Sequence, residues 1–225
     1  YENAKPDLEY ALKANNSPYK EKSLGKLGYI AYNIDKNYPA AYNYFVQLEE
    51  LATADDVKFE AQLGAMQSAY KNNDLQAVKT YASKVSKNSK ASKAQAANAS
   101  FYLGKIEYDA ENYTAAIPHF DKVSTALNNE VGAEARYLTA ESYFNTSNLD
   151  KAEQICMNAN KESSGFDHWI ARSVILLSDI NVERGDLLNA RAALEAVLEN
   201  YSNDAELVKM AQQKLSDLEK KEQGK

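Results

Sequence analysis

The chain has little glycine, little proline and almost no cysteine. Its 225 residues include 8 glycines, 4 prolines and the single cysteine Cys156. One cysteine excludes an internal disulfide framework and any metal site built from several thiolates. Scarce glycine and proline leave few tight reversals for β-hairpins, whereas the many alanine, leucine, lysine and glutamate residues favour helices. We therefore predict an all-α protein.

Long apolar runs and an excess of positive charge are also missing. No segment approaches the roughly 18 consecutive apolar residues that cross a bilayer, so we expect no transmembrane segment in this sequence. The formal net charge is −6, whereas sequence-independent nucleic-acid binding depends on lysine and arginine that neutralise phosphates. We therefore expect no nucleic-acid partner.

The sequence does contain a repeat. The stretch NYPAAYNYF at residues 37–45 returns as NYTAAIPHF at residues 112–120, and three further segments align with them. One column of this alignment holds only Asn or Asp, at Asn37, Asp74, Asn112, Asn148 and Asp186, spaced 37, 38, 36 and 38 residues apart. Such side chains accept a hydrogen bond from an unpaired amide in the first helical turn, so we predict a column of helix N-caps.

Apolar columns follow each cap and trace one stripe along a helix. The first column, four residues after the cap, holds Ala41, Val78, Ala116, Ala152 and Ala190. A second helical pattern of about fifteen residues precedes each cap. Each unit is therefore predicted to be two antiparallel helices joined by a tight turn. Neither helix can bury its stripe alone, so consecutive pairs must stack.

The sequence LGKIEYDAENYTAAIPHFDKV, residues 103–123, resembles a tetratricopeptide repeat through Leu103, Gly104, Ala116 and Phe120. The fourth copy resembles it through Ala140, Tyr143 and Ala152. The resemblance implies a right-handed superhelical solenoid of antiparallel helix pairs. Tyrosine- and asparagine-rich turns resemble bacterial envelope members of the family, which favours the periplasm or cell envelope over the cytoplasm.

The chain also departs from the family pattern. No copy has the usual tryptophan, and Glu107 stands where an aromatic residue is usual. The period exceeds the family's length of about 34 residues, which predicts longer turns between units. Pro118 lies inside a predicted helix and removes the bond to the carbonyl of Thr114, so we expect it to kink or delay that helix.

The expected domain is a single solenoid over residues 1–225. Residues 1–16 are predicted to be the second helix of a truncated preceding repeat, and residues 203–225 a capping helix that starts at Asn203 or Asp204. Ser17 is expected to cap the first helix of the first full repeat, with Pro18 opening it. The five repeats are predicted at 17–54, 55–90, 91–128, 129–164 and 165–202.

No constellation of residues indicates catalysis. His119 and His168 are the only histidines, and neither has metal-ligand spacing. Cys156 occupies an apolar column, which predicts a buried packing thiol and not a nucleophile. The carboxylates are spread along helix faces, so no general acid and base stand out. We expect no catalytic site, no cofactor and no metal, and hence no enzyme.

The resemblance implies that the first helix of each pair lines the concave side of the superhelix, where a protein or peptide partner would bind. Aromatic side chains suit such a surface because they give large contact area for few frozen rotors. The residues we propose for partner binding are Tyr70, Phe101, Lys105, Tyr108, Tyr137, Glu141 and Phe144. The Lys, Asn and Arg clamp by which some family members hold a peptide carboxylate is not rebuilt in these columns.

The predicted function is a non-catalytic scaffold that binds a peptide or partner protein in the concave groove. One alternative is a structural rod that stacks on further repeats or on itself, so self-association is a second expected kind of contact. Another is the repeat domain of a longer sensory or regulatory protein. Some of the aromatic rings could also pack between neighbouring helices, since an error of one residue in register would bury them.

Overall fold

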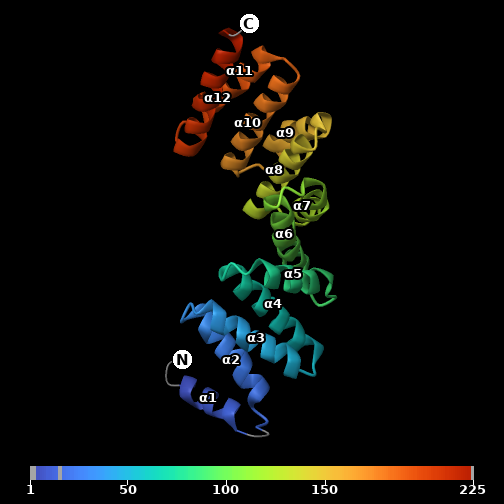
Figure 1. The fold of residues 1–225 in the computed structure, drawn as a ribbon, viewed down its shortest axis with the longest axis vertical. Helices are drawn as coiled ribbons and strands as arrows, with labels where there is room; N and C mark the ends of the chain where they lie inside the picture. The colour runs from blue at the N-terminus through green and yellow to red at the C-terminus, as the bar shows by residue number, and fades with distance from the viewer. Residues whose placement is uncertain (1–3, 15–16, 224–225) are drawn as a thin grey trace. The chain divides into compact units, whose positions relative to one another are not determined.

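The computed structural model of the chain describes residues 4–14 and 17–223. These residues form twelve α-helices and no β-strand, as Figure 1 shows. Residues 1–3, 15–16 and 224–225, which belong to the predicted segments 1–16 and 203–225, lie outside the described part. The chain divides into two compact units, Tyr1–Ile106 and Glu107–Lys225. The predicted all-α class and its helix pairs are confirmed.

Unit 1 is built from consecutive helices that pack on their neighbours. Each of its helices contacts the next from α1 to α5, and α2 also contacts α4. The elements are α1 (Lys5–Lys13), α2 (Lys20–Asn33), α3 (Tyr38–Leu51), α4 (Asp55–Lys71), α5 (Leu75–Lys87) and α6 (Lys93–Asp109), which unit 1 contains as far as Ile106.

Unit 2 repeats this arrangement. Each helix from α7 to α12 contacts the next, and α10 contacts both α8 and α12. The elements after the end of α6 are α7 (Tyr113–Ala126), α8 (Glu130–Asn145), α9 (Leu149–Glu162), α10 (Asp167–Glu183), α11 (Leu187–Asn200) and α12 (Ala205–Gln223). We call α2, α4, α6, α8 and α10 the first helices of their repeats, and α3, α5, α7, α9 and α11 the second helices.

The predicted apolar columns form the core on the second helices. Ala41, Ala116, Ala152 and Ala190 are all 0% exposed, and Val78 is 1% exposed. Because alanine is the smallest side chain that still favours a helix, this column allows neighbouring helices to approach closely. The next column, four residues further along, is buried as well in Phe120, Cys156 and Leu194.

Four of the five predicted N-caps make the expected bond. The side chains of Asn37, Asp74, Asn148 and Asp186 accept from the backbone N–H three residues later, at 3.1, 3.0, 3.4 and 3.1 Å. Asn112 stands at the N-cap of α7 without such a bond. Its Nδ2 instead donates to Glu107 Oε2 at 3.2 Å, so the carboxylate that replaces the family's aromatic residue turns the amide away from the helix.

The turn inside each repeat has a feature that the sequence did not predict. The residue before each N-cap has a positive φ, in Lys36, Asn73, Glu111, Ser147 and Gly185. In the last four turns its N–H bonds back to the third residue before it, and the N-cap N–H bonds to the fifth residue before it. This is the Schellman motif that closes a helix C-terminus. One residue therefore completes the end of the first helix and caps the second.

We expect glycine to suit this left-handed position better than the residues that occupy it. Ser147→Gly should raise the free energy of unfolding by about 0.5–1 kcal/mol, because Cβ is strained at positive φ. Gly185→Ala should lower it by about 1 kcal/mol for the same reason. An added Cβ at Gly185 has no atom within 4 Å, so packing would not contribute. Urea unfolding gives the free energy of unfolding of both variants. If both changes raise it or both lower it, the left-handed position does not favour glycine.

The extra length of the repeat lies in the helices and not in long turns. Three residues separate the two helices in repeats 2 to 5 and four in repeat 1. Four of the first helices have 16 or 17 residues, against 13 or 14 in the second helices. The longer turns were predicted between units, where the segments have three to five residues. These lengths lie within the roughly two to eight residues usual for helix–helix connections, so the predicted longer turns are not found.

One predicted helix start needs correction, and one is confirmed. Pro18 does not open a helix: α2 begins at Lys20, after a turn in which Ser17 Oγ accepts from the N–H of Tyr19 at 3.3 Å. Pro118 lies inside α7 as predicted, and it does not delay the helix, which begins at Tyr113 directly after Asn112. Asp204 caps α12 as predicted, accepting from Leu207 N at 3.2 Å.

Candidate partner-binding surface

In unit 1 the predicted surface residue Tyr70 is open to solvent, with 46% of its side chain exposed. Its ring stacks on Tyr102 of α6, with centroids 4.2 Å apart and planes 24° from parallel. Phe101 is buried at 8% exposure, and Lys105 is half-buried. Burial raises the pKa of the Tyr102 hydroxyl, and the nearby hydroxyls of Tyr70 and Tyr32 raise it further.

A hollow lies between the first helices α2 and α4. Its volume is about 290 Å³. Tyr29, Tyr32 and Leu63 supply most of its apolar wall, Asn33, Gln67 and Glu60 supply its polar groups, and Gly25, Phe45, Leu48 and Gly64 complete the lining. Tyr32 lines the hollow and lies near enough to Tyr102 to raise its pKa, and Gln67 shares a helix face with Tyr70, so the tyrosine stack adjoins the hollow. We call the hollow and the Tyr70–Tyr102 stack together the tyrosine groove.

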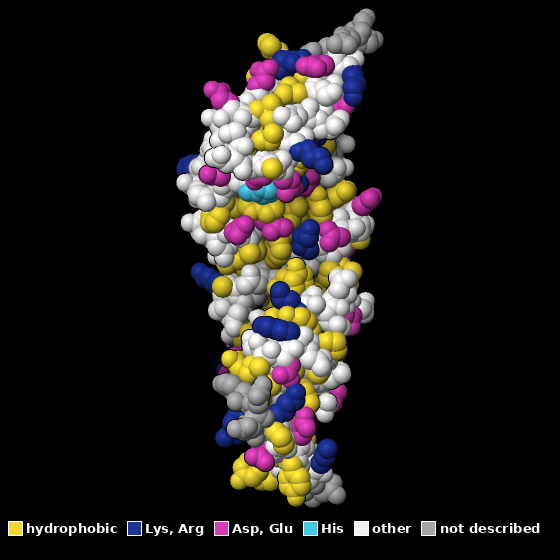
Figure 2. Space-filling view, turned by 90° about the vertical axis from the view of Figure 1, so that its left-hand side faces the viewer, with side chains coloured by type: hydrophobic (Ala, Val, Ile, Leu, Met, Phe, Trp, Pro, Cys, Tyr) yellow, Lys and Arg dark blue, Asp and Glu magenta, His cyan; other side chains and the backbone are white. Residues whose placement is uncertain are grey.

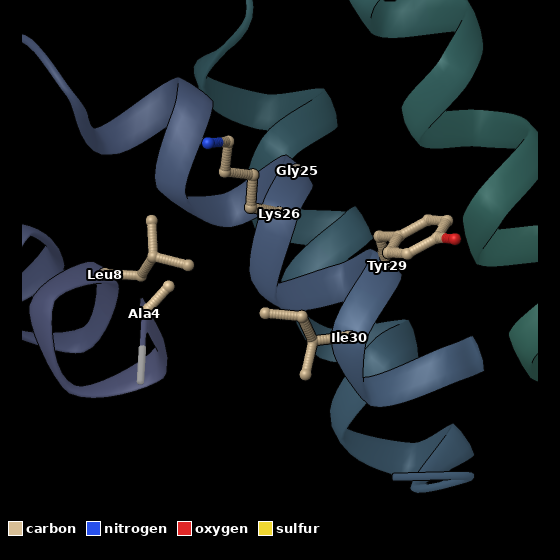
Figure 3. Close-up of a pocket in the computed structure, with 6 residues that line it drawn as sticks. All are labelled: Ala4, Leu8, Gly25, Lys26, Tyr29 and Ile30. Atoms are coloured by element: carbon tan, nitrogen blue, oxygen red, sulfur yellow. The ribbon is translucent and has the colours of Figure 1, made fainter. Parts of the chain in front are cut away.

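A second hollow lies on the other side of α2. It measures about 610 Å³ and is lined by Ala4, Leu8, Gly25, Lys26, Tyr29 and Ile30. Figure 3 shows Ala4 and Leu8 of α1 facing Lys26 and Ile30 of α2, while the Tyr29 ring points away from α1. Tyr29 is 50% exposed and lines both hollows. Tyr29 therefore lies between the two hollows.

In unit 2 the predicted residues form a hydrogen-bonded cluster. The hydroxyls of Tyr108 and Tyr137 donate to the two oxygens of Glu141, at 2.5 and 2.7 Å. Arg172 Nη2 donates to the Tyr137 hydroxyl at 3.0 Å, and its guanidinium lies 4.7 Å from the ring centre. Tyr137 is buried at 4% exposure, and Phe144 is half-buried. The cluster therefore holds its side chains to one another.

Sequence reasoning missed Tyr102 and Arg172. Neither is among the seven residues predicted for partner binding, yet each contacts one of them, Tyr102 with Tyr70 and Arg172 with Tyr137. A comparison of neighbouring repeats could have found them. An aromatic side chain on one first helix contacts a side chain on the first helix of the next repeat, as Tyr70 contacts Tyr102 and Tyr137 contacts Arg172. The structure brings Tyr108, Tyr137 and Glu141 together as a set and places Tyr70 with a different partner, in unit 1.

The tyrosine cluster predicts sensitivity to alkaline pH. Burial raises the pKa of Tyr108 and Tyr137, and Glu141 raises both further. A tyrosine whose pKa is raised by folding stabilises the folded chain at pH values below about 10, the pKa of tyrosine in the unfolded chain. This stabilisation is lost as the pH rises above about 10. Urea unfolding between about pH 8 and about pH 11 should show this loss. The double variant Tyr108→Phe, Tyr137→Phe should have a shallower slope; an unchanged slope would contradict the assignment.

His168 and Cys156, two titratable residues singled out in the sequence, lie apart from the tyrosine cluster's hydrogen bonds. Among the described residues, no group of three His, Cys, Asp or Glu side chains could hold a metal ion. His168 Nδ1 lies 2.8 Å from Asp204 Oδ2 at the start of α12. Cys156 is 3% exposed, and burial raises the pKa of its thiol to about 12, so the predicted packing thiol is confirmed.

Trp169 of α10 packs on the preceding repeat. Its ring centroid lies 5.7 Å from that of Tyr137 on α8. Several charged groups pair with neighbours of opposite sign, such as Lys84 with Glu49 at 2.8 Å and Lys214 with Asp179 at 2.7 Å. On the face in Figure 2, Lys and Arg are interspersed with Asp and Glu within each unit. Of the described helices, none combines the length and apolar character that a bilayer span needs.

Comparison with known families decides what the helix pairs are. A family model described as tetratricopeptide repeat matches residues 63–129, from the first helix of repeat 2 through repeat 3. The chain contains tetratricopeptide repeats. The predicted resemblance is thereby confirmed, and the tetratricopeptide fold supports a general role as a protein-interaction scaffold. No curated protein sequence matches the chain.

Two of the solved structures that resemble the chain share its fold, with TM-scores above 0.5. The structure described as MamA 41-end from Desulfovibrio magneticus RS-1 is 19% identical, with a TM-score of 0.63 over 83% of this chain and 97% of that one. A MamA RS-1 double mutant is 20% identical, with the same TM-score and coverage. A thermophilic repeat protein from Thermus thermophilus is 17% identical over 87% of this chain and 99% of that one, with a TM-score of 0.45.

Proposed function

We propose that the chain is a non-catalytic scaffold that binds a partner protein through an extended peptide or a helix laid against its first helices. The observation that carries the proposal is the tyrosine groove of unit 1. There Tyr29 and Tyr70 keep 50% and 46% of their side chains exposed on neighbouring first helices. Exposed rings of this kind make the anchors of protein interfaces, since they desolvate a large area with few rotors.

The seven residues predicted for partner binding divide into two roles under this proposal. Tyr70 presents its ring to a partner, with Lys105 half-buried on the next first helix. Phe101 and Tyr137 are buried, so they support the surface from beneath. In unit 2, Tyr108 and Glu141 hold one another in place, and Phe144 is half-buried beside the end of α8. We therefore place the main contact in unit 1.

A pull-down with a matched control tests the proposal. The bait is the full chain, compared with the double variant Tyr29→Ala, Tyr70→Ala. The control double variant is Tyr10→Ala, Tyr19→Ala, which removes two tyrosines that are 77% and 64% exposed outside the groove. Far-UV circular dichroism checks that all three baits are folded.

We expect a protein retained by the parent and control baits to be lost from the groove variant. Identical retention by all three baits would overturn the proposal. Retention of only the chain itself, unaffected by either variant, would instead favour a self-assembling structural rod. Sedimentation of the purified chain over a range of concentrations distinguishes that case.

A further inference from the structure

The tyrosine groove has a lining that selects among kinds of peptide. Its walls are aromatic rings, and hydroxyl and amide groups stand among them, in Tyr32, Tyr70 and Gln67. An α-helix bonds its own carbonyls internally, so a bound helix would make little use of these donors. A polyproline II segment has no internal hydrogen bonds and presents its carbonyls to whatever surrounds it. Aromatic walls with scattered donors are the surface that such segments bind.

The spacing of the groove also suits polyproline II. This conformation has three residues per turn and rises about 3.1 Å per residue, so one side chain returns to the same face about every 9 Å. Axes of packed helices lie about 8–10 Å apart, and α2 and α4 are in contact. Every third residue of a bound segment would thus meet the next first helix, with Tyr29 on α2 and Tyr70 on α4 as successive anchors.

The charge of the hollow restricts the sequence of the ligand. Glu60 is the one ionisable carboxylate among the residues that line the hollow between α2 and α4, and no Lys or Arg lines it. A carboxylate in this position favours a basic side chain opposite it and disfavours an acidic one. Proline rings fill the space between aromatic walls without adding a charge, so a basic residue next to a proline run is the complement of this surface.

We propose that the tyrosine groove of unit 1 binds a proline-rich segment in the polyproline II conformation that carries a basic residue opposite Glu60. The proposal rests on the scaffold function above and names the class of partner for the same groove. It requires no chemistry of the chain beyond contact. The rings stack on pyrrolidine faces, the hydroxyl and amide groups donate to peptide carbonyls, and Glu60 pairs with the basic side chain.

The test uses the purified full chain and three labelled synthetic peptides of roughly twelve residues, four turns of polyproline II. The first is a proline run with one central arginine. The second replaces every proline by glycine or serine and keeps the arginine. The third is an amphipathic helical peptide of equal charge. Fluorescence anisotropy gives the dissociation constant of each, and we expect the proline peptide to bind at least about tenfold more tightly than the other two.

Variants locate the contact. Tyr70→Ala should weaken the proline peptide by about tenfold or more, as expected for an aromatic anchor. Glu60→Gln should weaken binding of the arginine-containing proline peptide. A fourth peptide, an all-proline run without arginine, should bind Glu60→Gln and the parent chain equally. Tyr10→Ala is the control and should change the binding of neither peptide. Equal binding of the glycine–serine peptide, tighter binding of the helical peptide, or an equal loss in Tyr10→Ala would overturn the proposal.

The two proposals can fail separately. If no proline peptide binds, but the groove variant still loses a protein partner in the pull-down, the proline-rich ligand is wrong and the scaffold function stands. If the proline peptide does not bind and the pull-down is insensitive to Tyr29 and Tyr70, both are wrong. A helical peptide that competes for the groove would assign the partner to the helix-in-groove class.

Discussion

Replacing Gly64 by alanine is expected to lower the free energy of unfolding by about 1–3 kcal/mol, the usual cost of overpacking a tight contact. A Cβ placed on Gly64 of α4 would lie 2.7 Å from three ring atoms of Phe45 on α3. Contacts that short force the ring to move. Alanine favours a helix over glycine by about 1 kcal/mol, so the clash must exceed that gain for the expected result to appear.

Phe45 has little room to move because a second glycine lies against the same ring. A Cβ on Gly28 of α2 would lie 2.8 and 2.9 Å from the Cε1 and Cζ atoms of the same ring. The ring is therefore held between glycines of two successive first helices, and a shift away from one is a shift toward the other. We expect Gly28→Ala to destabilise the chain in the same range as Gly64→Ala.

Gly25 supplies a matched control in the same helix as Gly28. A Cβ there would be 3.6 Å from Leu48 Cδ2, an ordinary van der Waals contact. Gly25→Ala should therefore stabilise the chain by up to about 1 kcal/mol through helix propensity alone. Phe45→Leu combined with Gly64→Ala should recover part of the loss in a double-mutant cycle. Equal melting temperatures for the Gly25 and Gly64 variants would contradict the close contact between Gly64 and the Phe45 ring.

The second large effect is expected at the alanine column. Ala116→Leu or Ala152→Leu should lower the free energy of unfolding by roughly 1–3 kcal/mol, because each position is 0% exposed where second helices cross their neighbours. Leucine and alanine have similar helix propensities, so a loss would report packing. Chemical denaturation of the full chain measures it.

Ala115 is the control for this experiment, since it neighbours Ala116 on α7 but is exposed. Ala115→Leu should change stability by no more than about 0.5 kcal/mol, as is usual for surface positions. If the variants at 115 and 116 behave alike, the assignment of the buried stripe on α7 is wrong.

The columns that sequence predicted well are those where one residue type has one physical role. Asn and Asp at the start of a helix accept an amide, and alanine at fixed offsets buries a helix crossing; both patterns repeat, so the copies reinforce one another. Asn112 shows the limit of the argument. Its position as N-cap was predictable, but its side-chain bond depends on Glu107, which differs from the residue at that column in the family.

Other features depend on what a neighbouring helix covers, which a single helix pattern does not contain. Phe101 and Tyr137 were both predicted for the partner surface, yet both are buried; Tyr137 is covered by Trp169 and Arg172 of the next repeat. The left-handed turn residue escaped prediction for a different reason. Glycine is the usual sign of a left-handed position in a sequence, and only one of the five turns has it, at Gly185. The other four turns have Lys36, Asn73, Glu111 and Ser147 at this position.

The shared residue of the Schellman turn also bears on how such a chain can change in evolution. Four of the five turns inside repeats have the same three-residue length, whereas the segments between repeats vary from three residues, as between α7 and α8, to five between α5 and α6. The four-residue turn of repeat 1 shows what one extra residue does: Asn37 still caps α3, but its N–H bonds to Ala31, six residues before it, so the Schellman bonding is lost. An insertion inside a repeat therefore disturbs the end of the first helix, whereas the segments between repeats accept different lengths without this cost.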